Sequence, residues 1–262
     1  MWNSNPQVFP ELTEKEREFA IEDAIARARK EKGQRLFNLA YKAKVERERV
    51  FPSFDAKSFK DLLLRLGQTR AIERKWKFPF AIDEDNEKVV KLLCLYFTRD
   101  ERFEQQSPEF SLWKGIALVG DTGVGKTSLM QLCAKNPHAC YAQYDCKTIA
   151  DQYAEHGPEV IDKYIADFEI KNSDEHFGQK VIGRLFDDLG TEATAKHFGN
   201  EKNVMGDIIE GRYQGGWHNL THITSNHTLE EIHTMYGKRV SDRLREMCNI
   251  IEFPETAKSR RR

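Results

Sequence analysis

Isolated apolar residues recur through a charged N-terminal region at a spacing that predicts helix. Residues 13–48 are rich in Glu, Lys, Arg and Ala, and the apolar positions among them suit an amphipathic helix. We expect Gly33 to split this helix or to weaken it, because glycine lowers helix stability. The apolar positions are Phe19, Ile25, Leu36, Leu39 and Ala43.

A second helical stretch covers residues 56–66, and Gly67 is predicted to end it. A polar link follows, in which we place a domain boundary. The chain is therefore expected to consist of a helical N-terminal region, residues 1–66, which binds a partner, and a second domain, residues 67–262.

Beyond that link the pattern changes to short β-rich runs that alternate with helical stretches. A helix with apolar positions from Val89 to Phe97 comes first, and Asp83 or Asp85 is expected to cap it. Alternating strands and helices predict an α/β fold, a three-layer sandwich around a five-stranded parallel sheet. The predicted strands are Ile116–Val119, Cys140–Tyr144, Val181–Phe186, His222–Thr224 and Asn249–Phe253.

Composition limits the environment and the partners of the chain. Its formal net charge of -1 excludes attraction of the whole molecule to nucleic acid or to an anionic membrane, so such contacts require a local patch. Residues 27–49 carry a local excess of +6, which suits either a solvated helix face or a surface for a polyanion or partner. The longest apolar run, residues 92–97, is too short to span a membrane, so we expect a cytoplasmic protein.

The cysteines give no sign of a metal site. None of the five forms a C-x-x-C pair, and the eight histidines are not grouped with them. Zinc is therefore not expected, and buried reduced thiols are predicted.

A phosphate-binding loop follows the first predicted strand. The segment matches G-x-x-x-x-G-K-[ST] at every defined position, between a buried strand and a helix that starts near Ser128. Glycines let backbone N–H groups surround a phosphate, and the helix N-terminus adds its positive end. A lysine at this position reaches the β- and γ-phosphates of ATP, and the hydroxyl after it ligates Mg²⁺. The loop consists of Gly120, Asp121, Thr122, Gly123, Val124, Gly125, Lys126 and Thr127, and these residues together with Ser128 are expected to bind the nucleotide.

Polar residues end two further strands. Asp187 and Asp188 end the third predicted strand, 60 and 61 residues beyond Thr127. We predict that Asp187 holds Mg²⁺ and that Asp188 orients and deprotonates the attacking water. Asn226 ends the fourth strand, where its amide is expected to contact the γ-phosphate or the water. The alternative is that Asp188 only caps or pairs and that Asn226 belongs to an ordinary turn.

Four segments, in their order, resemble the DnaC/DnaI/IstB branch of AAA+ ATPases, which contains helicase loaders and transposition ATPases. The resemblance covers roughly residues 80–254. Besides the phosphate loop, it is carried by Phe186-Asp187-Asp188-Leu189-Gly190, Ile208-Ile209-Glu210-Gly211-Arg212-Tyr213, Ile223-Thr224-Ser225-Asn226 and Tyr236-Gly237-Lys238-Arg239-Val240-Ser241-Asp242-Arg243-Leu244.

The resemblance implies an ATPase of the AAA+ type without a C-terminal lid domain, assembled head to tail. Arg243 stands at the arginine-finger position, and Arg239 is the nearby alternative. The function implied is a helicase loader that binds ATP·Mg²⁺, a replicative helicase through its N-terminal helices, and single-stranded DNA. Two alternatives are an ATP-dependent filament on duplex DNA that serves transposition, and a nucleotide-gated interaction module with little hydrolysis.

Overall fold

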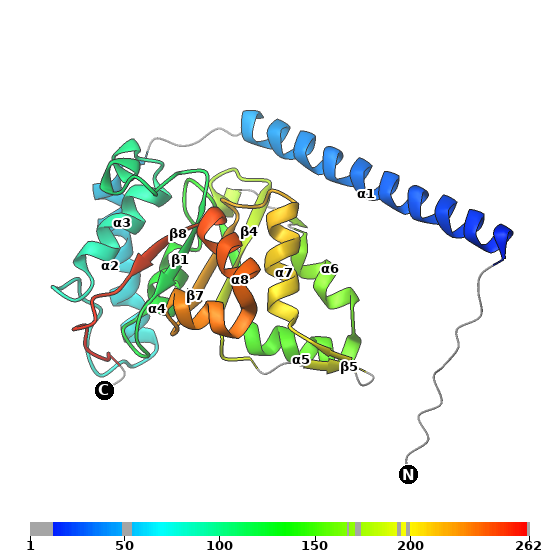
Figure 1. The fold of residues 1–262 in the computed structure, drawn as a ribbon. Coiled ribbons are helices and arrows are strands. Elements are labelled where there is room, and N and C mark those ends of the chain that lie inside the picture. The colour runs from blue at the N-terminus through cyan, green and yellow to red at the C-terminus, as the bar shows by residue number, and fades with distance from the viewer. Residues whose placement is uncertain are drawn as a thin grey trace, which may run out of the picture. The chain divides into compact units, whose positions relative to one another are not determined.

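The computed structural model in Figure 1 describes residues 13–48, 54–166, 168–170, 174–192, 195–197 and 200–260. The rest of the predicted N-terminal region, including residues 1–12 and 49–53, lies outside the described residues. Contacts between residues divide the chain into two units, Met1–Lys44 and Val45–Arg262.

The first unit consists, in its described part, of most of helix α1 (Glu14–Glu48). The predicted helix is confirmed, but Gly33 does not split it, because a single exposed glycine costs a helix only about 1 kcal/mol. The large apolar side chains whose exposure the structure describes, from Phe19 to Leu39, are exposed, and Phe19 is 73% accessible. Phe19 and Ile21 stand two positions apart and so face different sides of the helix. The apolar positions therefore do not form the single stripe expected of an amphipathic helix.

Helix α2 (Ala56–Glu73) runs through Gly67, so the prediction that Gly67 ends this helix is wrong. A Cβ atom at this position would lie 2.2 Å from the ring of Phe80. Glycine is therefore needed for close packing rather than for chain reversal. Phe59 and Leu63 of α2 are buried in the same apolar cluster as helix α3 (Glu87–Phe97). The boundary expected after residue 66 thus falls inside a helix of the second unit.

The centre of the second unit is the predicted parallel sheet, and all five predicted strands are present. Their order across the sheet is β2 (Tyr141–Asp145), β4 (Val181–Leu189), β7 (Thr221–Ser225), β1 (Gly115–Val119) and β8 (Cys248–Glu252), and every neighbouring pair is parallel. Two features were not predicted from the sequence. They are the short antiparallel strand β3 (Phe168–Glu169) beside β4, and the hairpin of β5 (Ala195–His197) and β6 (Asn200–Lys202).

Helices cover both faces of the sheet and make three layers, as expected (Figure 1). One face carries α2, α3 and α4 (Lys126–Cys133). The other face carries α5 (Cys146–His156), α6 (Glu159–Ile165), α7 (Val204–Gln214) and α8 (Leu229–Met247). Short 3₁₀ helices occupy Glu101–Gln106 and Asp174–His176.

Strand β1 shows why the sheet is buried on both sides. Ile116 and Leu118 belong to the cluster on the α2 face, and Ala117 belongs to the cluster on the α8 face, because successive side chains of a strand point in opposite directions. Burying one such isoleucine or leucine side chain stabilises the fold by about 1.5–3 kcal/mol. Parallel strands also end at one edge of the sheet, so the residues after β1, β4 and β7 are brought together.

The structure also bears on two expectations from the sequence, which concern the cysteines and membrane-spanning segments. All five cysteines are buried, as predicted, and burial raises the pKa of the Cys94 thiol to about 12. This thiol is therefore protonated and unreactive at neutral pH. In the part of the chain that the structure describes, no helix combines the length and the apolar character that crossing a membrane requires.

Candidate functional site

The phosphate loop connects the end of β1 to the start of α4. Gly120, Gly123 and Gly125 have φ values of 153°, 89° and 108°, which side-chain-bearing residues rarely adopt. A Cβ atom on Gly120 would also lie 2.7 Å from Cβ of Phe253, the residue directly after β8. The glycines predicted from the motif are thus required by backbone shape. The loop leads directly into a helix N-terminus, which favours bound anions.

Lys126 folds back over the loop that precedes it. Its side chain is 4% accessible, and Nζ donates hydrogen bonds to the carbonyl oxygens of Gly120 (2.6 Å) and Asp121 (2.8 Å) and to Oδ1 of Asn226 (2.7 Å). These three acceptors are uncharged oxygens. An anion that reached Nζ would replace a neutral contact with a charge-assisted one, which is roughly twice as strong.

Asp187 lies at the meeting point of four elements. One carboxylate oxygen, Oδ1, accepts hydrogen bonds from Oγ1 of Thr127 (3.0 Å) and Oγ1 of Thr224 (2.6 Å), and Oδ2 accepts one from Nε2 of Gln143 (2.7 Å). Burial raises the pKa of Asp187, and the hydrogen bonds from Thr224 and Thr127 oppose this effect. A cation beside the carboxylate would favour its charged form.

Asp188 sits on an irregularity in β4 that the sequence did not reveal. The pairing of β4 with β7 shifts between Phe186 and Leu189, so β4 gains one residue over its neighbour. Asp188 has a φ of 57°, and its N–H donates to Oγ1 of Thr224 at 2.9 Å. A bulge of this kind re-aims side chains next to functional sites. Here Asp187 reaches the helix after the phosphate loop, while Asp188 lines the adjoining cavity.

Asn226 follows β7, which lies between β1 and β4. The sheet order therefore brings this residue between the phosphate loop and the two aspartates, where the sequence predicted it. Asn226 contacts Lys126 and lines the same cavity as Asp188. The tertiary structure thus brings the phosphate loop, Asp187, Asp188 and Asn226 together at one edge of the sheet, and their individual roles stay predictions.

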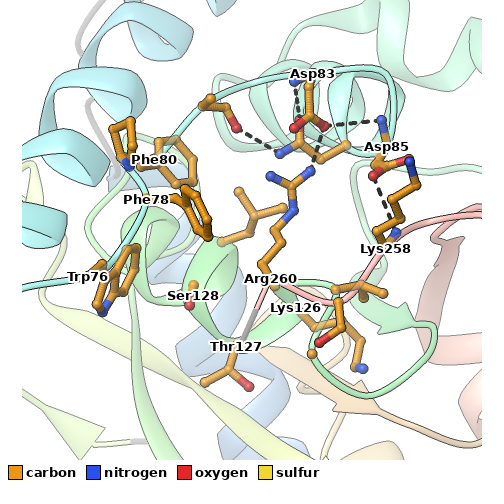
Figure 2. A pocket seen from close by; sticks show the side chains of 18 of the residues that line it. Trp76, Phe78, Phe80, Asp83, Asp85, Lys126, Thr127, Ser128, Lys258 and Arg260 are labelled. Atoms are coloured by element: carbon orange, nitrogen blue, oxygen red, sulfur yellow. Dashed lines mark hydrogen bonds and ion pairs between the residues drawn. The ribbon is translucent and has the colours of Figure 1, made fainter. Parts of the chain in front are cut away.

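The cavity beside the phosphate loop has a volume of about 890 Å³. Two of its walls were not predicted as parts of a site (Figure 2). One is the link after α2, which contributes the aromatic residues Trp76, Phe78 and Phe80. The other is the C-terminal segment Lys258, Ser259 and Arg260. The cluster of aromatic residues in a polar link was the only sequence signal for the first wall.

Chemistry at the end of β4 suits Mg²⁺. The Thr127 hydroxyl and the Asp187 carboxylate lie side by side, and both are the hard oxygen ligands that Mg²⁺ prefers. Among the described residues, no group of three His, Cys, Asp or Glu side chains could hold a metal ion on its own.

Arg243 and Arg239 lie on α8 and are not among the described residues that line the cavity. The guanidinium of Arg243 lies 4.1 Å from the ring centre of Tyr213 and donates to Glu246 at 3.1 Å. Arg239 pairs with Glu210 at 3.0 Å. The predicted role of Arg243 as a finger toward a neighbouring subunit stays a prediction.

Comparison with known proteins gave only structural likenesses. No family model and no curated protein matched the sequence. A solved structure described as the DnaC helicase loader is similar at 17% identity and a TM-score of 0.44, over 67% of this chain and 93% of that one. A structure described as a DNA replication initiation factor is similar at 16% identity and a TM-score of 0.44, over 66% of this chain and 47% of the other. The function of this chain therefore rests on the chemistry of its own residues.

Proposed function

We propose that this chain is a P-loop ATPase that binds ATP with Mg²⁺ at the edge of its sheet. The observation that carries the proposal is the convergence of Lys126, Asn226, Asp188 and the Thr127–Asp187 pair around the phosphate loop. These residues come from the ends of two neighbouring strands, β4 and β7, and from the helix that follows the loop. A site that only stabilised the fold would not need a buried ammonium group beside a cavity.

Binding is proposed to begin with the triphosphate on the loop. Lys126 would exchange its backbone carbonyl contacts for phosphate oxygens, and the N-terminus of α4 would face the same negative charge. Thr127 and Asp187 would hold Mg²⁺, which neutralises charge on the phosphate oxygens when bound. The positive ion would also favour the ionised form of Asp187, against the effect of burial on its pKa.

Hydrolysis is proposed to depend on Asp188. Its carboxylate would accept a proton from water as the water oxygen bonds to the γ-phosphorus, while the bond to the β–γ bridging oxygen breaks and ADP leaves. The hydrogen bond from its own N–H to Thr224 fixes the backbone at this point. Asn226 would offer its amide to the γ-phosphate or to the water. Positioning of this kind is the main contribution of a protein to phosphoryl transfer.

The nucleobase is proposed to lie against the aromatic wall of the cavity. Phe78 is 58% accessible although it is a large apolar residue, and it lines the cavity together with Trp76 and Phe80. Covering such a ring with a planar base removes apolar surface from water, and base–aromatic stacking is worth about 1–3 kcal/mol.

In its biological role the chain is proposed to act in DNA replication as a helicase loader. The sequence resemblance supports this role, together with the exposed apolar side chains Phe19, Leu36 and Phe37 on α1, which would dock a replicative helicase. Single-stranded DNA is proposed as a further ligand. A transposition ATPase acting on duplex DNA is the alternative, and a stable complex with helicase but not with transposase would separate the two.

Two variants test the nucleotide site. Lys126→Ala should lower the affinity for a fluorescent ATP analogue with Mg²⁺ by tenfold or more, because a charge-assisted hydrogen bond is worth about 1.5–3 kcal/mol. Asp188→Asn should bind the analogue as the wild type does but release phosphate about 10²–10⁴ times more slowly, because the amide cannot accept a proton.

Lys135→Ala is the matched control, because Lys135 pairs with Glu175 at 3.1 Å on the surface and is not among the residues that line the cavity. Lys135→Ala should change neither the affinity for the ATP analogue nor the rate of phosphate release. Unchanged affinity in folded Lys126→Ala protein would disprove the nucleotide site. Loss of binding rather than turnover in Asp188→Asn would disprove the assigned role of Asp188.

A further inference from the structure

The segment that follows β8 returns over the phosphate loop. The N–H of Phe253 donates to the carbonyl of Val119, the last residue of β1, at 2.9 Å. Further on, the N–H of Lys258 donates to Asp85 at 3.3 Å, and the N–H of Arg260 donates to the carbonyl of Gly123 at 2.9 Å. Backbone contacts thus fix this segment against the loop, independently of its side chains.

These contacts place the Arg260 side chain at the phosphate loop. Its Cδ lies 3.6 Å from the position of a Cβ atom on Gly125, and the residue lines the cavity with Lys126, Thr127 and Asp188. Figure 2 shows the side chain extending from the C-terminal segment toward Asp83, and a guanidinium nitrogen meets Asp83 Oδ1 at 2.5 Å. The guanidinium therefore lies beside a cavity that already contains one buried cation.

The acidic partner of Arg260, Asp83, also accepts local backbone hydrogen bonds at the start of α3. Asp83 or Asp85 was expected to cap α3, but the N-cap is Asn86, so this prediction is wrong. The carboxylate of Asp83 instead accepts the N–H of Asp85 at 3.1 Å and pairs with Arg260, and this pairing lowers the pKa of Asp83. Both side chains of the pair remain partly accessible, 31% for Arg260 and 46% for Asp83. Ion pairs this exposed contribute little and can be exchanged easily.

We propose that Arg260 is a second phosphate-binding cation of the nucleotide site, held ready by Asp83 until a nucleotide arrives. The guanidinium exchanges the carboxylate for oxygens of the nucleotide's phosphate groups, to which its planar fork can donate two hydrogen bonds at once. The inference rests on the proposed nucleotide site and extends it. Arg260 comes from the same chain, whereas the role proposed for Arg243 concerns a neighbouring subunit.

The exchange predicts effects of opposite sign for the two partners. Arg260→Ala should weaken the binding of a fluorescent ATP analogue by about tenfold, and Arg260→Lys should recover part of the loss, because lysine keeps the charge but not the fork. Asp83→Asn should strengthen binding, because it frees Arg260 while keeping an oxygen for the N–H of Asp85. In the Arg260→Ala background, Asp83→Asn should have little effect.

Arg102→Ala is the matched control. Arg102 also pairs with an aspartate, Asp100, at 2.5 Å, but neither residue is among those that line the cavity. This variant should bind the analogue as the wild type does.

Three results would overturn the inference. If Arg260→Ala and Asp83→Asn weakened binding of the analogue equally, the ion pair would only hold the C-terminal segment in place. Tighter binding by Arg260→Ala would mean that Arg260 obstructs the cavity. Unchanged binding in Arg260→Ala, with binding lost in Lys126→Ala, would leave the nucleotide site standing without this cation. Unchanged binding in Lys126→Ala would disprove the proposed function itself.

Discussion

His222 joins the strand of the phosphate loop to the centre of the sheet. Its Nδ1 accepts a hydrogen bond from the N–H of Ile116 at 3.1 Å, which requires the neutral imidazole, and its ring packs against Phe97 and Tyr141. Burial lowers the pKa of His222 to about 3, and the nearby charge of Arg212 contributes. Protonation would therefore break the contact that fixes β1.

This lowered pKa predicts that stability falls in acid. The unfolded chain takes up a proton on this histidine near pH 6.5, whereas the folded chain does so only near pH 3. The contribution of His222 is thus complete above pH 6.5 and is lost as the pH falls, at about 1.4 kcal/mol per pH unit. Urea unfolding at pH 7.5, 6 and 5 measures the slope. His222→Gln should reduce it, and replacement of the exposed His233 by Gln should not. Equal slopes in all three proteins would contradict the assignment.

At the scale of elements, replacing a helical glycine by alanine is expected to have opposite effects on stability at two positions. Gly67 of α2 faces the ring of Phe80, and an added Cβ would lie 2.2 Å from it. Gly67→Ala should therefore lower the free energy of unfolding by about 1–3 kcal/mol, because the ring must move. At Gly33 of α1, an added Cβ meets no described atom within 4 Å. Gly33→Ala should stabilise its helix by about 0.5–1 kcal/mol.

Urea unfolding followed by circular dichroism measures the stability change of each variant. Both variants add the same methyl group to a helix, so a difference in sign between them reports the different surroundings of the two glycines. Because Phe80 also lines the cavity, Gly67→Ala should weaken nucleotide binding as well. A Gly67→Ala protein as stable as the wild type would show that the contact with Phe80 can relax without cost.

At the scale of the whole molecule, the prediction concerns assembly. Arg243 does not line the cavity of its own chain in the described structure, so its proposed action requires a neighbouring copy. Arg243→Ala should bind ATP normally and hydrolyse it slowly, because charge developing on the γ-phosphate is not neutralised. Mixing it with Lys126→Ala protein should restore part of the activity, since some interfaces then pair an intact loop with an intact arginine.

Phosphate release measured over a range of protein concentrations tests the same point. A head-to-tail contact is heterologous and must close into a ring or continue as a filament, so activity per subunit should rise with concentration. Turnover that is independent of concentration and shows no recovery on mixing would assign Arg243 to its own subunit or to a structural role.

The sequence by itself determined the sheet and the phosphate loop. The strand from Ile116 to Val119 and the glycines after it form a local pattern, in which the identity of each residue sets the backbone shape it can adopt. Strand β4 was found for the same reason, because a continuous apolar run bounded by polar residues is typical of a buried strand.

Only the tertiary structure decided which distant residues meet. The bulge at Asp188 depends on the pairing of β4 with β7. The need for a glycine at position 67 depends on the close approach of the Phe80 ring. Neither leaves a periodic signal. Lys126 meets a residue 100 positions away, and Arg260 meets Asp83 across 177 positions. Such contacts follow from the order of the strands and the path of the connecting segments, which the packing of the whole chain fixes and no local window of sequence contains.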